Sequence, residues 1–259
     1  MTIAGSDSGG GAGIQADLKT FAAHGVYGMS VITAITAQNT RAVTAVHEVP
    51  AEVVAAQIDA VFADLGVDAV KIGMRASVPL VSTVAERLAA WLEETAVPVV
   101  LDPVMVAKSG DALLRDDAVA ALIEQLLPLA TVVTPNLPEA RRLTGVDGED
   151  QESRRAMARA LSARGPAALI KGGHGAGDDL QDLLFDGREF RPFEHRRIAT
   201  RSDHGTGCTL SSALAARLGR GESLVTAVRG SIDYLRGALA AAYPLGAGRG
   251  PVDHLFDLS

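Results

Sequence analysis

A glycine-rich stretch that leads into a helix contains the residues best suited to chemistry. It runs Asp203-His204-Gly205-Thr206-Gly207-Cys208 and continues into small and apolar residues. Gly205 and Gly207 permit backbone angles that other residues avoid, and they let the backbone approach a ligand closely. The first amides of a helix have no partner within it, and the helix dipole favours negative charge there. The stretch therefore predicts an anion-binding site.

Cys208, the only cysteine in the chain, lies in the first turn of this predicted helix. Amides and a dipole that stabilise an anion also stabilise a thiolate, so we expect the pKa of this thiol to be lowered. A nucleophile or base beside an anion hole is a catalytic arrangement. A capped helix start with an inert small residue is the alternative explanation of the same residues.

Composition restricts the classes of protein that are possible. The chain has 259 residues, of which 47% are apolar and 4% aromatic, enough for one large α/β domain or two small ones. A formal net charge of −7 argues against nucleic acid as a partner. One cysteine fits a reducing cytoplasm, and no apolar run has the length of a membrane span. Met1-Thr2-Ile3 enters a predicted strand at once, so we expect no signal peptide.

Predicted strands and helices alternate through most of the chain. Apolar runs predict strands at 1–4, 27–37, 43–49, 68–72, 97–101, 131–133 and 167–170, and Asp186-Gly187 predicts a hairpin between 183–185 and 188–190. Apolar periodicity predicts helices around 14–22, 51–65, 80–92, 118–127, 139–143, 153–163, 208–218 and 224–243. This order predicts a mostly parallel sheet covered by helices on both faces. In such sheets ligands bind beyond the carboxyl ends of the strands, where glycine and polar residues collect in this sequence.

Two common phosphate-binding motifs do not fit the chain. A P-loop requires Gly-Lys followed by Ser or Thr, and no Gly-Lys pair occurs. The run Gly11-Ala12-Gly13-Ile14-Gln15-Ala16 matches a dinucleotide fingerprint, but the acid expected at the end of the next strand is missing, because that strand ends in Thr36-Ala37-Gln38.

Side chains at two strand ends could serve a magnesium ion. Asp102 follows a buried strand, and Asn136 and Glu139 lie one helical turn apart. Mg²⁺ typically takes one or two protein carboxylates and keeps waters and phosphates as its other ligands. A capping box is the alternative explanation of Asn136 and Glu139, and a turn before Pro103 is the alternative for Asp102.

Motifs along nearly the whole chain, in order, resemble the hydroxymethylpyrimidine/phosphomethylpyrimidine kinases of thiamine biosynthesis, in the ribokinase-like superfamily. They are the run from Gly5 to Asp17, Tyr27-Gly28-Met29-Ser30 through Thr40, Lys71-Ile72-Gly73-Met74, Asp102-Pro103-Val104-Met105, Thr134-Pro135-Asn136-Leu137-Pro138-Glu139-Ala140, Lys171-Gly172-Gly173-His174 and His204-Gly205-Thr206-Gly207-Cys208-Thr209. The resemblance implies a ribokinase-like three-layer αβα sandwich with a mostly parallel central sheet, formed by one domain over residues 1–259.

The resemblance also implies an activity. The γ-phosphoryl of ATP would pass to the hydroxymethyl group of 4-amino-5-hydroxymethyl-2-methylpyrimidine, and a second phosphoryl would convert the monophosphate to the diphosphate. ATP and Mg²⁺ are the implied cofactors. The implied protein is cytoplasmic and homodimeric, since members of the family are often dimers.

Particular residues receive roles from the resemblance. By the resemblance, Gly205, Thr206, Gly207 and Cys208 form the anion hole. Many related sugar kinases carry an Asp that acts as the catalytic base at the position of Cys208. Gln38 matches the residue that hydrogen-bonds the pyrimidine. The other matches are the substrate-pocket positions Gly5, Asp17, Met74 and Val104, the nucleotide and phosphate positions Asn136, Lys171 and His204, and the magnesium positions Asp102 and Glu139.

Two other activities stay open. Pyridoxal kinases are relatives that also carry Cys at the base position and accept rings with a hydroxymethyl group. The second alternative is a non-catalytic vitamer- or nucleotide-binding protein with the same fold. The intact Gly205-Thr206-Gly207-Cys208 loop argues against this alternative. Asp203 departs from the family pattern, in which Thr often precedes the His, and places a negative charge beside the predicted phosphate site.

Overall fold

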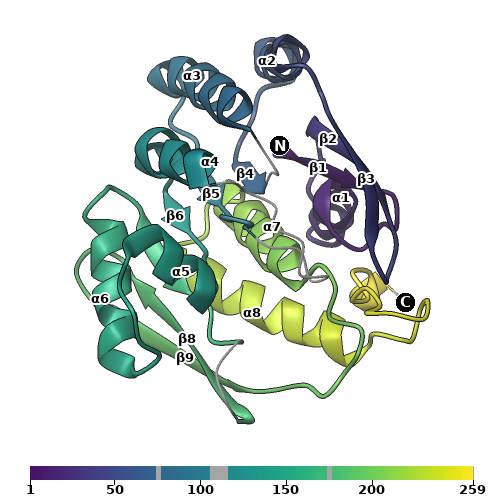
Figure 1. Ribbon diagram of the computed structural model, residues 1–259, viewed down its shortest axis with the longest axis vertical. Helices are drawn as coiled ribbons and strands as arrows, with labels where there is room; N and C mark the ends of the chain where they lie inside the picture. The colour runs from purple at the N-terminus through teal and green to yellow at the C-terminus, as the bar shows by residue number, and fades with distance from the viewer. Residues whose placement is uncertain (74–76, 106–115, 174–176, 259) are drawn as a thin grey trace.

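A nine-stranded sheet runs through the part of the chain that the computed structural model describes, residues 1–73, 77–105, 116–173 and 177–258 (Figure 1). Its strand order is β3-β2-β1-β4-β5-β6-β7-β8-β9. The pairings from β2 across to β7 are parallel, whereas β3, β8 and β9 join the edges in antiparallel pairings. The prediction of a mostly parallel sheet is confirmed.

The strands largely follow the apolar runs of the sequence. They are β1 (Thr2–Asp7), β2 (Ser30–Gln38), β3 (Val43–Glu48), β4 (Val70–Gly73), β5 (Val99–Leu101), β6 (Val132–Val133), β7 (Ala167–Ile170), β8 (Asp179–Phe185) and β9 (Phe190–Arg196). The predicted hairpin at Asp186-Gly187 joins β8 and β9, but both strands are longer than the sequence indicates. β9 also begins at Phe190 rather than Arg188.

Eight α-helices occur within the described residues. They are α1 (Gly13–Ala23), α2 (Ala51–Ala60), α3 (Val78–Glu94), α4 (Asp116–Ala121), α5 (Leu137–Thr144), α6 (Gln151–Ser162), α7 (Thr206–Gly219) and α8 (Leu224–Ala240). The helix predicted over 51–65 consists of α2 followed by a π-helical stretch, η1 (Val61–Leu65). In the same way, α4 is followed by the π-helical stretch η2 (Leu122–Leu126). Two short 3₁₀ turns are η3 (Leu127–Leu129) and η4 (Phe256–Leu258). None of the described helices is long and apolar enough to cross a membrane.

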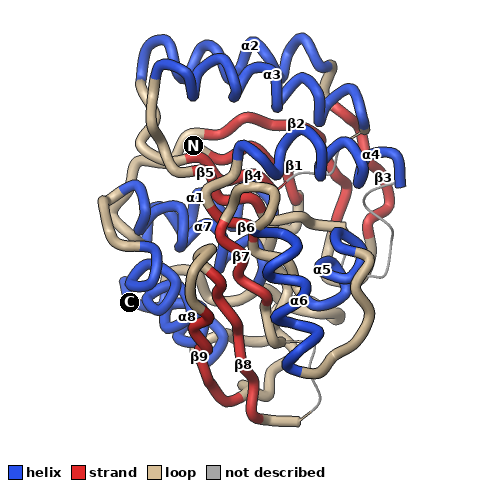
Figure 2. The backbone as a smooth tube through the Cα atoms, turned by 90° about the vertical axis from the view of Figure 1, so that its left-hand side faces the viewer, coloured by secondary structure: helices blue, strands red, loops and turns tan. Residues whose placement is uncertain are grey.

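The helices cover the sheet on both faces and so complete the predicted three-layer αβα sandwich. One core joins the sheet to α2 through α6, and a second joins it to α1, α7 and α8. Successive residues of a strand point to opposite faces, so in β5 Val99 and Leu101 belong to the first core and Val100 to the second. Figure 2 shows α1, α7 and α8 on one side of the central strands and α4, α5 and α6 on the other.

Candidate active site

A cavity of about 530 Å³ lies at the carboxyl ends of the parallel strands. Twelve of the fourteen predicted site residues line it: Gly5, Gln38, Asp102, Val104, Asn136, Glu139, Lys171, His204, Gly205, Thr206, Gly207 and Cys208. They come from strands near their ends and from the starts of α5 and α7. The fold therefore brings together side chains that lie up to about 200 positions apart in the sequence.

The start of α7 forms the predicted anion hole. Gly205 is its N-cap with a φ of 83°, and a Cβ atom there would lie within 1.8 Å of the Gly11 carbonyl oxygen, so only glycine fits. The amide and hydroxyl of Thr209 both donate to the Gly205 carbonyl oxygen, at 2.8 and 2.9 Å. Because the carbonyl and amide of one peptide plane point in opposite directions, the Thr206 N–H points away from the helix. This amide is available to an anion in the cavity.

Cys208 lines the cavity and is half-buried, but its acidity differs from the prediction. Burial raises the pKa of the thiol to about 11, with further contributions from the charges of Asp17 and Asp102. Lys71 and the amide of Gly13 act in the opposite direction without outweighing burial. The expected lowering of the pKa is therefore wrong, because the loss of water exceeds the stabilisation that the helix start provides.

An ion pair between Asp102 and Lys171 borders the anion hole. Lys171 Nζ lies 3.1 Å from Asp102 Oδ1, and the hydroxyl of Ser211 on α7 donates to Asp102 Oδ2 at 3.3 Å. A Cβ atom at Gly207 would lie 3.3 Å from Asp102 Oδ2 and 3.4 Å from Lys171 Nζ. Burial alone would lower the pKa of Lys171, but Asp102 and Glu139 hold it above its ordinary value, so the side chain remains a cation.

Asn136 and Glu139 form the capping box that was the alternative to a magnesium site. The Glu139 amide donates to Asn136 Oδ1 at 2.9 Å, and the Asn136 amide donates to Glu139 Oε2 at 2.7 Å. Both residues nevertheless line the cavity. Burial raises the pKa of Glu139 to about 7, Asp102 raises it further, and Lys171 opposes the shift. Glu139 thus caps α5 and also places a carboxyl group on the cavity wall.

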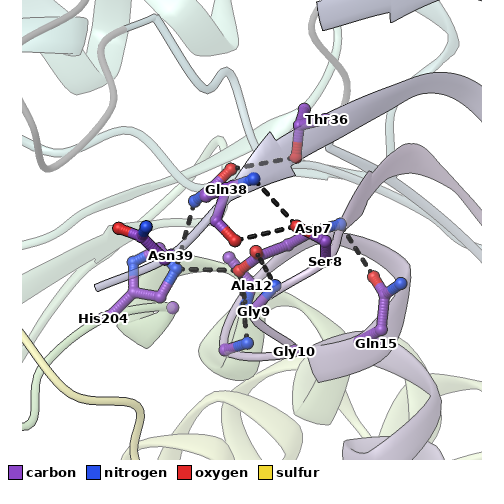
Figure 3. A network of polar contacts seen from close by, with 12 residues as sticks. Asp7, Ser8, Gly9, Gly10, Ala12, Gln15, Thr36, Gln38, Asn39 and His204 are labelled. Carbon is purple, nitrogen blue, oxygen red and sulfur yellow. Dashed lines mark hydrogen bonds and ion pairs between the residues drawn. The ribbon is translucent and has the colours of Figure 1, made fainter. Parts of the chain in front are cut away.

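A polar network at the end of β1 and β2 connects Gln38 with the anion-hole loop (Figure 3). His204 Nε2 lies 2.9 Å from Asp7 Oδ2 and 3.3 Å from Gln38 Nε2, while Thr36 Oγ1 donates to Gln38 Oε1 at 3.2 Å. Asp7 also accepts hydrogen bonds from the amides of Gly9, Gly11 and Ala12.

Asp7 is a site residue that the sequence analysis missed. Burial acts to raise the pKa of its carboxyl, but the hydrogen bonds from His204 and the backbone amides hold it below the usual value. The carboxylate is therefore an anion that fixes both the glycine loop before α1 and the imidazole before α7. An acidic residue at a strand end, inside a glycine run, is the signal that could have indicated it.

Residues 7–253 match the family model described as phosphomethylpyrimidine kinase. The chain belongs to this family. A hydroxymethylpyrimidine/phosphomethylpyrimidine kinase of Rhizobium meliloti (strain 1021) is 57% identical over 258 residues, which cover 98% of this chain and 96% of the relative. The protein is therefore a kinase, and the resemblance seen in its motifs is confirmed.

Solved structures support the same conclusion. Phosphomethylpyrimidine kinase of Clostridium difficile 630 has a TM-score of 0.81 at 43% identity, with 92% of this chain and 97% of that chain covered. Pyridoxal kinase of Staphylococcus aureus in complex with AMP-PCP and pyridoxal has a TM-score of 0.89 at 34% identity, with 99% and 93% covered. The ribokinase-like fold is thereby confirmed.

One predicted substrate-pocket position of this family member, Asp17, does not line the cavity. Asp17 lies on the buried face of α1 and is wholly buried behind the cavity. Its carboxylate forms an ion pair with Lys71. Its assignment to the pocket lining is therefore corrected. Met74 lies outside the described residues. Asp203, the residue that departs from the family pattern, forms an ion pair with Arg249. The cation of Arg249 therefore partly offsets the negative charge of Asp203 beside the predicted phosphate site.

The segment after α8 forms hydrogen bonds with the anion-hole loop and the first turn of α7. His204 donates its backbone amide to the Gly250 carbonyl oxygen at 2.9 Å. Further along, Nε2 of His254 lies 3.1 Å from Thr209 Oγ1, whose proton goes to the Gly205 carbonyl. His254 is only 4% exposed, and burial lowers its pKa to about 4. A neutral His254 therefore supports the hydrogen bond that orients the N-cap of α7.

We expect His254 to make the fold sensitive to mild acid. Its folded-state pKa of about 4 lies below the ordinary value of about 6.5. Between these pH values the unfolded chain binds a proton that the folded chain does not, so stability falls as the pH drops through this window. Between pH 7 and 4.5 the free energy of unfolding of wild type should therefore fall by roughly 2–3 kcal/mol more than that of His254→Gln, as measured by urea unfolding. The same substitution at exposed His47 is the control, and an equal acid loss in wild type and His254→Gln would contradict the prediction.

Proposed function

We propose that the cavity binds 4-amino-5-hydroxymethyl-2-methylpyrimidine beside Gln38 and the phosphates of ATP at the start of α7. The γ-phosphoryl passes to the hydroxymethyl oxygen, and a second transfer to the monophosphate gives the diphosphate used in thiamine biosynthesis. The observation that carries this proposal is the convergence of Cys208, the α7 amides and the Asp102–Lys171 pair on one cavity that Gln38 also lines. The names of the relatives support it.

The phosphate end of the cavity stabilises charge by position. Phosphoryl transfer has a loose transition state, so placement of the groups and stabilisation of the charge on the phosphoryl oxygens dominate catalysis. The Thr206 amide and the Lys171 ammonium provide a hydrogen-bond donor and a cation at this end. Because both are fixed, by the Gly205 cap and by Asp102, they need no rearrangement when charge develops.

Cys208 is the proposed base for the first transfer. The hydroxymethyl proton must leave as the new oxygen–phosphorus bond forms, and a side chain in the first turn of α7 can accept it. With a pKa of about 11 the thiol is protonated at neutral pH, so its thiolate is rare but strongly basic. Turnover on the alcohol is therefore limited by the small thiolate fraction, which grows as the pH rises.

ATP is supported as the phosphoryl donor by the AMP-PCP complex of the related pyridoxal kinase. Within the described residues no group of three or more His, Cys, Asp or Glu side chains could hold a metal ion. Asp102 and Glu139 nevertheless place two carboxyl groups at the phosphate end, and Mg²⁺ typically takes one or two, with phosphates and waters as its other ligands. We assign Mg²⁺ to this pair, where it would neutralise charge on the phosphates of ATP.

Three further expectations remain proposals. We propose that residues 1–259 form a single kinase domain, because all nine described strands join one sheet. A homodimer and a cytoplasmic location stay predictions from the family resemblance. Pyridoxal kinase activity is the second candidate function, favoured by the TM-score of 0.89 to the pyridoxal complex.

Substitution of Gln38 should separate the two candidate substrates. A carboxamide offers an acceptor and donors at once, and an aminopyrimidine presents an amine donor beside a ring-nitrogen acceptor, whereas pyridoxal lacks that pair. An unpaired polar edge costs about 1–3 kcal/mol, so Gln38→Leu should raise the KM of the pyrimidine by roughly tenfold to a hundredfold. The KM of ATP should hardly change, and pyridoxal, if accepted, should lose much less.

The experiment measures ATP consumption with the pyrimidine alcohol, its monophosphate and pyridoxal in parallel. Gln38→Glu is the matched control, since it keeps the shape and an acceptor but removes the amide donors. An equal loss for both rings would mean that Gln38 shapes the pocket without reading the pyrimidine. Activity on pyridoxal alone would overturn the proposed substrate.

A further inference from the structure

A fully buried ion pair lies behind the floor of the cavity. Lys71 Nζ is 3.0 and 2.9 Å from the two carboxylate oxygens of Asp17, and both side chains are 0% exposed. Asp17 also accepts hydrogen bonds from Thr2 Oγ1 at 2.6 Å and Ser212 Oγ at 2.7 Å. The pair therefore joins β1, α1, β4 and α7 at one point, and its carboxylate is well supplied with donors.

Gly73 places the ammonium group directly beneath the cavity. Lys71 and Gly73 are two positions apart on β4 and so share a face of the sheet. A Cβ atom at Gly73 would lie 2.3 Å from Lys71 Nζ, and Gly73 itself lines the cavity. The lysine side chain thus extends along the strand toward the site, into space that the glycine leaves free.

The same pair lies next to Cys208. Ser212, which donates to Asp17, follows Cys208 by one helical turn and shares its face of α7. Among the described residues, the charged groups that act on the thiol are Lys71 and Asp17 of this pair, Asp102 after β5, and Lys171 after β7. Burial would lower the pKa of Lys71, but Asp17 and the other negative groups hold it above its ordinary value, so it is a cation.

A buried ion pair is a costly way to fill a core. A neutral pair of similar volume is often as stable or more stable, because two charges must lose their water. We propose that Lys71, held in place by Asp17, is a positioning residue whose ammonium stabilises the thiolate of Cys208 from behind the cavity floor. This inference rests on the proposed role of Cys208 as a base. It assigns Asp17 to the support of the lysine, not to contact with the substrate.

The single cysteine of the chain permits a direct test. Alkylation by iodoacetamide reports the thiolate fraction of Cys208, and it is measured from pH 7 to 9.5 with EDTA present and without nucleotide. Lys71→Met/Asp17→Asn removes both charges and roughly keeps the volume. We expect its alkylation rate to be lower than that of wild type at each pH, because Lys71 favours the thiolate more than Asp17 opposes it. The kcat on the pyrimidine alcohol should fall in parallel, with little change in the KM of ATP.

Two further variants make the result specific. Arg87→Met/Asp59→Asn removes a partly exposed ion pair between α2 and α3, which cover the face of the sheet opposite α7. This variant should be alkylated at the rate of wild type. Lys71→Gln leaves the Asp17 charge in place and should alkylate even more slowly than the double variant. Circular dichroism and thermal unfolding establish that each variant is folded.

The outcomes are distinct from those of the proposed function. A folded Lys71 variant with the alkylation rate of wild type would overturn the positioning role, whatever its kinase activity. Slower alkylation in a protein whose turnover does not depend on Cys208 would support the electrostatic role of Lys71 while it contradicts Cys208 as base. Slower alkylation together with a lower kcat supports both.

Discussion

Cys208→Ala is expected to lower turnover on the pyrimidine alcohol by on the order of 100-fold or more, through the loss of base catalysis. The thiol lies in the first turn of α7 and lines the cavity, so alanine removes the proton acceptor without filling space. The backbone amides and the Asp102–Lys171 pair remain, and ATP should bind as before. The measurement is kcat by ATP consumption at pH 8, with circular dichroism to verify the fold. Because thiolate becomes more abundant toward a pKa of about 11, wild-type turnover should also rise with pH, and the alanine variant should lose that dependence.

The monophosphate substrate supplies the control for this prediction. A phosphate monoester has a second pKa near 6, so at pH 8 its attacking oxygen is already ionised and needs no base. Cys208→Ala should therefore reduce turnover on the monophosphate by less than about tenfold. Equal losses on the two substrates would assign the thiol a role in shape instead of proton transfer. Near-normal turnover on the alcohol would remove Cys208 from the mechanism.

The sheet and its helices could be predicted because apolar periodicity is a local property of the sequence. Apolar runs and amphipathic stretches alternate, and that alternation requires a covered parallel sheet. The end of β1 could not be predicted in this way. Gly5-Ser6-Asp7 has the composition of a loop, yet Ser6 and Asp7 pair with Ile35 and Thr36 of β2 and extend the strand. That pairing depends on a neighbour about thirty residues away, which the local pattern does not contain.

The candidate site shows the same division. The positions of Gly205, Gln38 and Lys171 at strand and helix ends followed from sequence and family resemblance, and they do meet at one cavity. The acidity of Cys208 did not follow, since it depends on burial and on carboxylates far away in the chain. Asp17 could have been placed correctly, because its spacing from Ile14 and Phe21 puts it on the buried face of α1.

Gly207→Val is expected to abolish turnover while the pyrimidine still binds. The position lies in the first turn of α7, and a Cβ atom there would already be 3.3 Å from Asp102 Oδ2 and 3.4 Å from Lys171 Nζ. The two further methyl groups of valine would occupy the space in front of this pair, where we propose that the transferred phosphoryl group lies. Because the donors of an anion hole are fixed, a displaced phosphoryl group cannot recover them. Turnover is measured by ATP consumption, and binding of the pyrimidine by calorimetry.

Gly207→Ala is the graded control for the valine variant. It adds the single carbon whose contacts with Asp102 and Lys171 are tight but tolerable, so partial turnover should survive, about tenfold below wild type by the usual sensitivity of catalysis to small misplacements. A ranking of wild type, alanine and valine by turnover, with pyrimidine affinity constant, would tie the loss to volume in front of the ion pair. If a folded Gly207→Val protein keeps its turnover, the phosphoryl group must be held elsewhere, and the start of α7 would then be only a capped helix.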